Sequence, residues 1–216
     1  MVTLYHYIHC PFCVRVRLAL GFLKINYQSK VLPYHDEKTP LALTNIKMLP
    51  IITKADGTHM NESLDIIQNL DANDILSFKH LNAQTIESLG KMLNSLGSPI
   101  HSLCMPYWVY TKEFDEKSRH YFQSKKEKKR GLFRNLILNK DKYLNQLIPL
   151  LEEVENKLIP YYESERLSIK DIMLASHLWG LYIFPEFQFS IKINTYLQEI
   201  KKQCQFEYHE DFWSEN

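Results

Sequence analysis

Glycine is scarce in this sequence, with six glycines among 216 residues. Phosphate-binding loops and dinucleotide-binding folds depend on glycine-rich turns such as G-x-G-x-x-G and G-x-x-x-x-G-K. Neither pattern occurs here, and H-E-x-x-H and G-x-S-x-G, which mark zinc peptidases and serine hydrolases, are also missing. The sequence therefore gives no support to a nucleotide-binding, dinucleotide-binding or serine-hydrolase function.

An excess of charge of one sign and a long apolar run are missing as well. The formal net charge is +1, so no overall field draws the protein to nucleic acid or anionic lipid. The most apolar stretch, residues 169–189, contains Lys170, Asp171, His177 and Glu186, whereas a membrane helix needs about 20 apolar residues. The first residues also lack the basic segment of a signal peptide. We therefore expect a cytoplasmic protein that binds neither nucleic acid nor membrane.

Cysteine is rare and unevenly placed. Cys10 and Cys13 form a C-x-x-C pair, whereas Cys104 and Cys204 are isolated. Small secreted domains use cysteine more densely, so this pattern favours a compartment in which thiols stay reduced. A structural zinc site needs four ligands, and no second C-x-x-C or suitable histidine pair is present, so we expect no metal. The two isolated cysteines are expected to be small buried hydrophobic residues.

The first third of the chain alternates between strand-like and helical segments. Residues rich in β-branched and aromatic side chains predict strands at 2–7, 27–32, 49–53 and 58–60. A helix is predicted from Pro11, because proline suits the first helical position, and another over residues 62–70. In the first helix the apolar spacing predicts burial over much of the surface, with Arg15, Arg17 and Lys24 reaching solvent.

The sequence changes in character after Asp71. Residues 71–80 are polar and lack periodicity, and no strand pair is evident beyond them. We therefore predict an α/β domain over residues 1–72, a linker over residues 73–80 and an all-helical domain over residues 81–216.

The second domain contains several strong helix signals. One amphipathic helix is predicted by the spacing of Leu144, Leu147, Leu151, Val154 and Leu158. Pro149 is expected to kink or break it. Residues 168–184 and 191–203 are also predicted helices. Residues 168–171 form a capping box, with Leu167 and Ile172 spaced as a hydrophobic staple.

The C-x-x-C pair, Cys10-Pro11-Phe12-Cys13, joins the first predicted strand to the first predicted helix. Cys10 then lies at a helix N-terminus, whose free N–H groups and positive dipole end favour a thiolate, the nucleophilic form. Cys13 lies one helical turn further on the same face, where it can resolve a mixed disulfide on Cys10. This arrangement is typical of thiol–disulfide oxidoreductases. The alternative, half of a zinc site, lacks its other ligands.

Two further segments have features of a peptide-binding site. A cis Leu49-Pro50 bond would turn the Leu49 backbone toward a peptide-like ligand, and an ordinary trans bond is an equal alternative. Asn61, Glu62 and Ser63 lie at the start of a predicted helix. Such an N-terminus binds carboxylates, with Ser63 as a further donor and Glu62 as a partner for an ammonium group. The same residues also predict helix capping.

Three motifs in this order resemble those of thioredoxin-fold domains that bind glutathione: Cys10-Pro11-Phe12-Cys13, Leu49-Pro50-Ile51 and Glu62-Ser63-Leu64-Asp65-Ile66. With a helical second domain, the chain resembles the two-domain bacterial glutaredoxins of the glutaredoxin 2 type over essentially its whole length. Phe12 departs from the more usual tyrosine, which removes a hydroxyl but keeps the aromatic ring. The implied fold is an α/β thioredoxin-like N-terminal domain plus an all-α glutathione-transferase-like C-terminal domain.

This resemblance implies a glutathione-dependent oxidoreductase that reduces protein–glutathione mixed disulfides and protein disulfides. It makes Cys10 the nucleophile and Cys13 the resolving thiol. The glutathione-binding residues that it implies are Pro11, Phe12, Leu49, Pro50, Glu62 and Ser63. Leu49 would pair with the cysteinyl backbone, and Glu62 and Ser63 would hold the γ-glutamyl ammonium and carboxylate. Glutathione is then the co-substrate, the partners are glutathionylated or disulfide-containing proteins, no metal is needed, and a monomer is expected.

Two other functions fit the same fold. A glutathione transferase would activate the glutathione thiolate with a hydroxyl group, for which Tyr5 and Tyr7 are candidates. A cysteine at the helix N-terminus, however, would capture glutathione as a disulfide. A non-catalytic binding module would have no need of Cys13.

Three remaining features are expected to be structural rather than functional. We expect His9 to be a solvated turn residue rather than a group that tunes the thiolate. The basic run at residues 125–130 predicts a solvated helix face rather than a site for acidic partners. Tyr107, Trp108 and Tyr110 predict core packing rather than the wall of an interdomain pocket.

Overall fold

The computed structural model describes residues 1–207. Residues 208–216, the last part of the predicted helical domain, lie outside the described residues. The N-terminal part contains a mixed sheet in the order β2-β1-β3-β4. Its strands are β1 (Val2–His6), β2 (Tyr27–Val31), β3 (Ile51–Thr53) and β4 (His59–Met60). Strand β1 runs parallel to β2 and antiparallel to β3, so that Leu4 lies opposite both Ser29 and Ile52.

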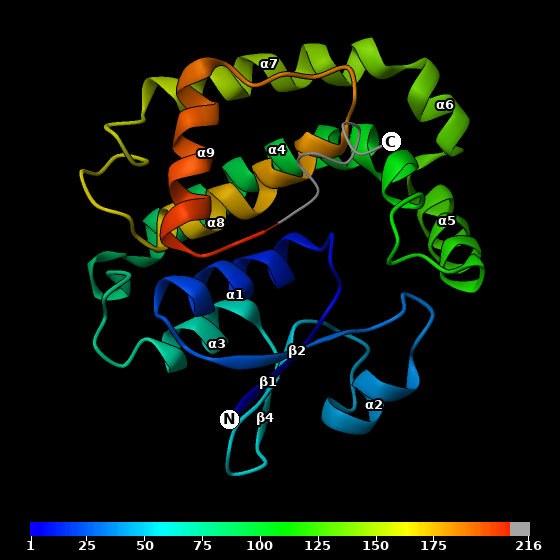
Figure 1. Cartoon of the computed structure of the whole chain (residues 1–216). Coiled ribbons are helices and arrows are strands. Elements are labelled where there is room, and N and C mark those ends of the chain that lie inside the picture. Colours follow the sequence, from blue (N-terminus) through cyan, green and yellow to red (C-terminus); the bar gives the residue numbers. More distant parts are fainter. Residues whose placement is uncertain (208–216) are drawn as a thin grey trace.

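Helix α1 (Pro11–Phe22) joins the two halves of the protein. Pro11 occupies its first turn, as predicted, because the missing N–H is not needed there. Figure 1 shows α1 and α3 (Ser63–Leu70) between the sheet and the C-terminal helices. Helix α1 contacts α3 on one side and α8 (Ile169–Leu178) on the other. The N-terminus of α1 therefore lies where the two halves meet.

The C-terminal half consists of helices and connecting loops within the residues that the structure describes, with two isolated β-bridges in the loop before α8. Its α-helices, besides α8, are α4 (Ala83–Trp108), α5 (Glu116–Arg130), the short α6 (Phe133–Leu138), α7 (Lys140–Asn156) and α9 (Ile191–Gln203). Helix α7 continues through Pro149, so this proline does not break it. After α8 the chain tightens into a 3₁₀ turn (Trp179–Ile183). No helix within residues 1–207 is long and apolar enough to cross a membrane.

The segment between the halves, residues 71–80, is packed rather than extended. It contains a 3₁₀ turn (Phe78–His80), which follows α3 in the chain. A further short helix of the N-terminal part, α2 (Lys38–Thr44), lies between β2 and β3. The Asp71 carboxylate accepts hydrogen bonds from the backbone N–H groups of Ile75 and Leu76, at 2.8 and 2.7 Å. Leu76 is fully buried, and its carbonyl accepts a hydrogen bond from Ile169 N–H, at 2.9 Å. These contacts fasten the connection to the start of α8.

The predicted capping box at the start of α8 is confirmed. Asp171 is fully buried, and its Oδ2 accepts hydrogen bonds from the N–H and hydroxyl of Ser168, at 2.8 and 3.0 Å. Its Oδ1 accepts from Tyr162 N–H at 2.7 Å and from the Tyr196 hydroxyl at 3.0 Å. One carboxylate thus connects α8 with the preceding loop and with α9.

Replacing Asp171 with asparagine is expected to lower the free energy of unfolding by about 2 kcal/mol, because an amide has only one acceptor oxygen for four donors. The measurement is chemical denaturation monitored by circular dichroism. Asp141→Asn is the matched control, since Asp141 is an exposed acid in the first turn of α7, and it should change stability by less than about 0.5 kcal/mol. Equal losses in the two variants would contradict the structural role of the buried carboxylate.

Candidate functional site

Cys10 and Cys13 differ in their exposure to solvent. Cys10 is the N-cap residue of α1 and is half-buried, whereas Cys13 lies inside the first turn and is fully buried. The Tyr7 backbone N–H approaches Cys13 Sγ at 3.4 Å. All four cysteines are free thiols, and Cys104 and Cys204 are buried as predicted. The more accessible Cys10 is therefore the one placed to attack a disulfide.

The two thiols of the pair also differ in acidity. The pKa of Cys10 is lowered to about 7, chiefly by a hydrogen bond from the Cys13 thiol and further by the N–H groups of Phe12 and Cys13, against the opposing effect of burial. Burial raises the pKa of Cys13 well above its usual value, and its hydrogen bond to Cys10 acts in the same direction. Near neutral pH a substantial fraction of Cys10 is thus thiolate, while Cys13 keeps its proton.

Lys126, from α5 of the helical half, is a further charge that lowers the pKa of Cys10. It is half-buried, with Nζ 5.4 Å from the centroid of the Phe122 ring. Arg130 is also half-buried, and its Nη1 donates to Ser98 O at 3.1 Å. The prediction that the basic run is a solvated face is therefore wrong for these two residues. It holds for Lys125, Lys128 and Lys129, which are exposed.

Replacing Cys13 with alanine is expected to raise the pKa of Cys10 more than replacing Lys126 with methionine, because the hydrogen bond from Cys13 is the larger stabilising effect. A higher pKa leaves less thiolate at pH 7, so iodoacetamide should alkylate Cys10 more slowly there. The measurement is the pH profile of alkylation, with Lys128→Met as the exposed control on the same helix. Superimposable profiles in all four proteins would show that neither group stabilises the thiolate.

His9 is buried, so the prediction of a solvated turn residue is wrong. Its Nε2 lies 2.8 Å from Thr111 Oγ1 and 3.9 Å from a carboxylate oxygen of Glu113. Its ring stacks on Trp108 and Phe114, with centroids 5.4 and 5.8 Å apart. Aromatic residues of the helical half enclose this side chain, so His9 fixes the turn before Cys10 to that half.

The aromatic cluster at the C-terminal end of α4 divides into three environments. Trp108 is buried against His9, and Tyr107 is half-buried near Phe184. Tyr110 is exposed, so the prediction of core packing is wrong for this residue. Trp108 therefore lies at the junction of the two halves rather than in the interior of one.

The peptide bond between Leu49 and Pro50 is cis, which decides between the two alternatives for this segment. The Leu49 side chain packs with Cys13 and Ile51, and Cys10 borders the same cluster. Within residues 1–207 the backbone N–H and C=O of Leu49 form no hydrogen bond. This segment therefore lies next to the dithiol with its backbone groups available.

The start of α3 is not capped by a side chain, so the capping expected of Asn61, Glu62 and Ser63 is not observed. Glu62 has φ 66° and ψ 106°, a conformation that costs a non-glycine residue on the order of 1–3 kcal/mol and is often found at ligand sites. Ser63 is buried, and its Oγ accepts a hydrogen bond from Arg15 Nη1 at 3.1 Å. The first N–H groups of α3 thus have no side-chain acceptor within the described chain.

Arg15 is buried, with 4% of its surface exposed, which corrects the prediction that it reaches solvent. Its guanidinium carbon lies 5.1 Å from the centroid of the Phe12 ring. Phe12 itself is 48% exposed, and Pro11 is buried beneath it in the first turn. The structure thus brings the dithiol, Leu49-Pro50 and the start of α3 around one region, with Arg15 among them.

Arg15 and Lys126 were not predicted to belong to this region. The apolar spacing of α1 did not distinguish a buried arginine from an exposed one, because the covering helix α8 lies more than 150 residues further along the chain. Lys126 lies in a run of similar basic residues and has no local signal of its own. Both assignments require the tertiary contacts.

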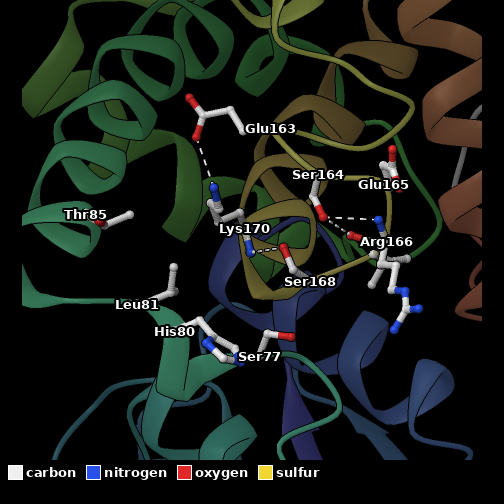
Figure 2. Close-up of a pocket in the computed structure, with 11 residues that line it drawn as sticks. Ser77, His80, Leu81, Thr85, Glu163, Ser164, Glu165, Arg166, Ser168 and Lys170 are labelled. Atoms are coloured by element: carbon white, nitrogen blue, oxygen red, sulfur yellow. Dashed lines mark hydrogen bonds and ion pairs between the residues drawn. The ribbon is translucent and has the colours of Figure 1, made fainter.

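No group of three or more histidine, cysteine or acidic side chains suited to a metal ion occurs in residues 1–207. A groove of about 560 Å³ lies elsewhere, between the start of α4 and residues 163–170. Figure 2 shows Lys170 paired with Glu163 in it, at 3.0 Å. It contains none of the predicted site residues.

Family models match both halves of the chain. Residues 88–212 match the C-terminal domain of glutaredoxin 2, and residues 4–75 match a glutathione S-transferase N-terminal domain. The chain is 28% identical to glutaredoxin 2 of Escherichia coli over 209 residues, which cover 94% of this chain and 96% of that protein. Similarity to a known protein thus extends across both halves.

Solved structures agree with these matches. Glutaredoxin 2 of Salmonella typhimurium, crystallised in complex with glutathione, superposes with a TM-score of 0.84 at 28% identity, covering 96% of each chain. Glutathione transferase GSTFuA3 of Phanerochaete chrysosporium gives a TM-score of 0.80 at 15% identity, covering 96% of this chain and 98% of that one, which shows the shared fold alone. The predicted fold class is confirmed. Since the glutaredoxin 2 model covers more than half of the residues, the chain belongs to the glutaredoxin 2 family.

Proposed function

We propose that this protein is a glutathione-dependent thiol–disulfide oxidoreductase that reduces protein–glutathione mixed disulfides and protein disulfides. The observation that supports it most directly is the contrast within the dithiol. Cys10 is half-buried with a pKa of about 7, and Cys13 is a buried thiol that donates a hydrogen bond to it. A thiol with a pKa near the ambient pH combines a large thiolate fraction with good nucleophilicity.

In the first step the Cys10 thiolate attacks the glutathionyl sulfur of a mixed disulfide. The old S–S bond breaks, the substrate leaves as a thiolate that takes up a proton, and Cys10 carries glutathione as a mixed disulfide. In the second step a glutathione thiolate attacks the glutathionyl sulfur on Cys10. Oxidised glutathione forms and the Cys10 thiolate is restored. Cys13 offers a second route for protein disulfides: Cys10 first attacks one sulfur of the substrate and forms a mixed disulfide with it. Cys13 then loses its proton and attacks the Cys10 sulfur, so that the substrate leaves with both thiols reduced and a Cys10–Cys13 disulfide forms. Two glutathione molecules reduce this disulfide in successive exchanges and leave as oxidised glutathione.

The surroundings of the dithiol support glutathione as the co-substrate. The free backbone N–H and C=O of Leu49, next to Pro50 and the dithiol, suit an extended peptide bound like an added strand. The uncapped start of α3 suits a carboxylate. In this arrangement Leu49 pairs with the cysteinyl backbone, and Glu62 and Ser63 receive the γ-glutamyl ammonium and carboxylate.

Pro11 and Phe12 complete the proposed glutathione site. Phe12 is about half exposed near Cys10 and provides an apolar wall, while Pro11 is buried and holds the first turn of α1 in place. The glutathionyl sulfur must approach Cys10 past this wall.

The test is the reduction of the mixed disulfide between glutathione and 2-mercaptoethanol, coupled to glutathione reductase and followed as NADPH consumption. We expect turnover, and no conjugate above background when the same preparation is given glutathione and 1-chloro-2,4-dinitrobenzene. Conjugation without reduction would instead identify a transferase. Inactivity in both assays would leave a binding module on the same fold.

The proposal extends to the partners and the compartment of the protein. The protein substrates are glutathionylated or disulfide-containing proteins, and the protein is proposed to act as a monomer in the cytoplasm, where glutathione keeps thiols reduced. Size-exclusion chromatography with light scattering tests the monomer, and trapping with Cys13→Ser followed by mass spectrometry identifies the substrates.

A further inference from the structure

Arg15 is a buried cation without an acidic partner in the described chain. Its Nη1 donates to Ser63 Oγ at 3.1 Å, while its Nε is buried and has no acceptor within residues 1–207. No carboxylate lies within 4 Å of its guanidinium in this part of the chain. Charged side chains are rarely buried unless they are paired, because an unpaired charge or donor loses its hydration without compensation. Within the described chain the charged group that acts on Arg15 is the Cys10 thiolate, and no carboxylate satisfies the remaining donors of its guanidinium. The position of Arg15 therefore leaves room for a carboxylate from a ligand.

The groups around Arg15 narrow down where that anion binds. His177, which faces it from α8, has its pKa lowered to about 4 by burial and is neutral near pH 7. Phe12 packs against the guanidinium and against His177. The remaining polar neighbour, Ser63, opens α3. The guanidinium thus bonds the residue that opens α3, where the first N–H groups have no side-chain acceptor, and both kinds of donor favour negative charge.

We propose that Arg15 binds the α-carboxylate of the γ-glutamyl residue of glutathione, together with Ser63 and the start of α3, and that it makes the enzyme selective for disulfides that carry this group. The inference rests on the proposed function and adds a specificity-determining residue to it. A guanidinium binds a carboxylate through parallel N–H···O bonds, and the donors of Arg15 that lack a protein acceptor are suited to this.

The test compares two chromophoric mixed disulfides of 2-nitro-5-thiobenzoate, one with glutathione and one with cysteinylglycine, which lacks the γ-glutamyl group. The second-order rate constant for release of the aryl thiolate from reduced protein is measured for wild type, Arg15→Lys and Arg15→Met. Arg15→Met is expected to lower the rate constant for the glutathione compound roughly 10- to 100-fold, the usual effect of a hydrogen bond to a charged group. The rate constant for the cysteinylglycine compound should change less than about threefold. Arg15→Lys keeps the charge and should restore part of the selectivity.

Two further measurements distinguish an Arg15 that binds the carboxylate from an Arg15 that only stabilises the thiolate. If Arg15→Met slows both compounds equally and raises the pKa of Cys10 in the alkylation profile, Arg15 is the counter-charge of the thiolate and the proposal is overturned. If the variant does not fold, the wild type is tested with the aryl mixed disulfide of a glutathione analogue in which the γ-glutamyl α-carboxylate is converted to an amide. The rate constant for this compound should be lower than that for the glutathione compound. Equal rate constants overturn the proposal. A wild type that reacts with neither compound contradicts the proposed function itself.

Discussion

Substituting serine for Cys10 is expected to abolish the reduction of glutathione mixed disulfides, with a loss of roughly 10³-fold or more. The serine hydroxyl does not ionise near neutral pH and forms no disulfide, so no covalent intermediate can arise. The hydrogen bonds that lower the pKa of Cys10 to about 7 have no comparable effect on an alcohol. The measurement is the coupled assay with the mixed disulfide of glutathione and 2-mercaptoethanol.

Cys13→Ser is the matched comparison, since it changes the same atom three residues further along α1. It is expected to keep activity toward glutathione mixed disulfides, because glutathione itself resolves the intermediate on Cys10. Reduction of a protein disulfide should fall much more, since that route needs the second thiol. If Cys10→Ser retained activity and Cys13→Ser did not, the assignment of nucleophile and resolving thiol would have to be reversed.

The dithiol could be placed from sequence because every signal that positions it is local. Strand residues precede Cys10, Pro11 suits the first turn of a helix, and the spacing of Cys13 puts it one turn away. The capping box at Ser168 and Asp171 was equally accessible, for the same reason. Signals from neighbouring residues of this kind determine where a helix begins, and α1 and α8 begin at the residues that these signals predict.

The parts of the site that sequence did not reveal depend on contacts between distant segments. His9 is buried by Trp108 and Phe114, about a hundred residues away. Arg15 is covered in the assembled fold, and Lys126 approaches Cys10 from the helical half. Likewise, the residues around Leu49-Pro50 in the sequence did not predict whether this peptide bond is cis or trans. The domain boundaries at residues 72 and 80 stay predictions, since the segment between them is packed against α8.

Replacing Gly21 with alanine is expected to destabilise the protein by about 3 kcal/mol or more, which corresponds to a fall in Tm of roughly 6–12 °C for a chain of this size. A Cβ at this position would lie 1.6 Å from the backbone oxygen of Cys204 and 2.7 Å from its carbonyl carbon. Cys204 is the C-cap of α9, so α1 and α9 cannot keep their present distance. The clash outweighs the gain of about 1 kcal/mol that alanine brings to a helix interior.

Gly90→Ala is the control, because no atom lies within 4 Å of a Cβ added at Gly90 in α4. It should be neutral or slightly stabilising. Thermal denaturation of the two variants measures the difference, and equal Tm values would contradict the close approach of α1 to the end of α9. Gly21→Ala also bears on chemistry, because α1 carries Cys10 at its other end. If the clash moves α1 away from the helical half, Lys126 loses its proximity to Cys10, and the pKa of that thiol should rise together with the fall in Tm.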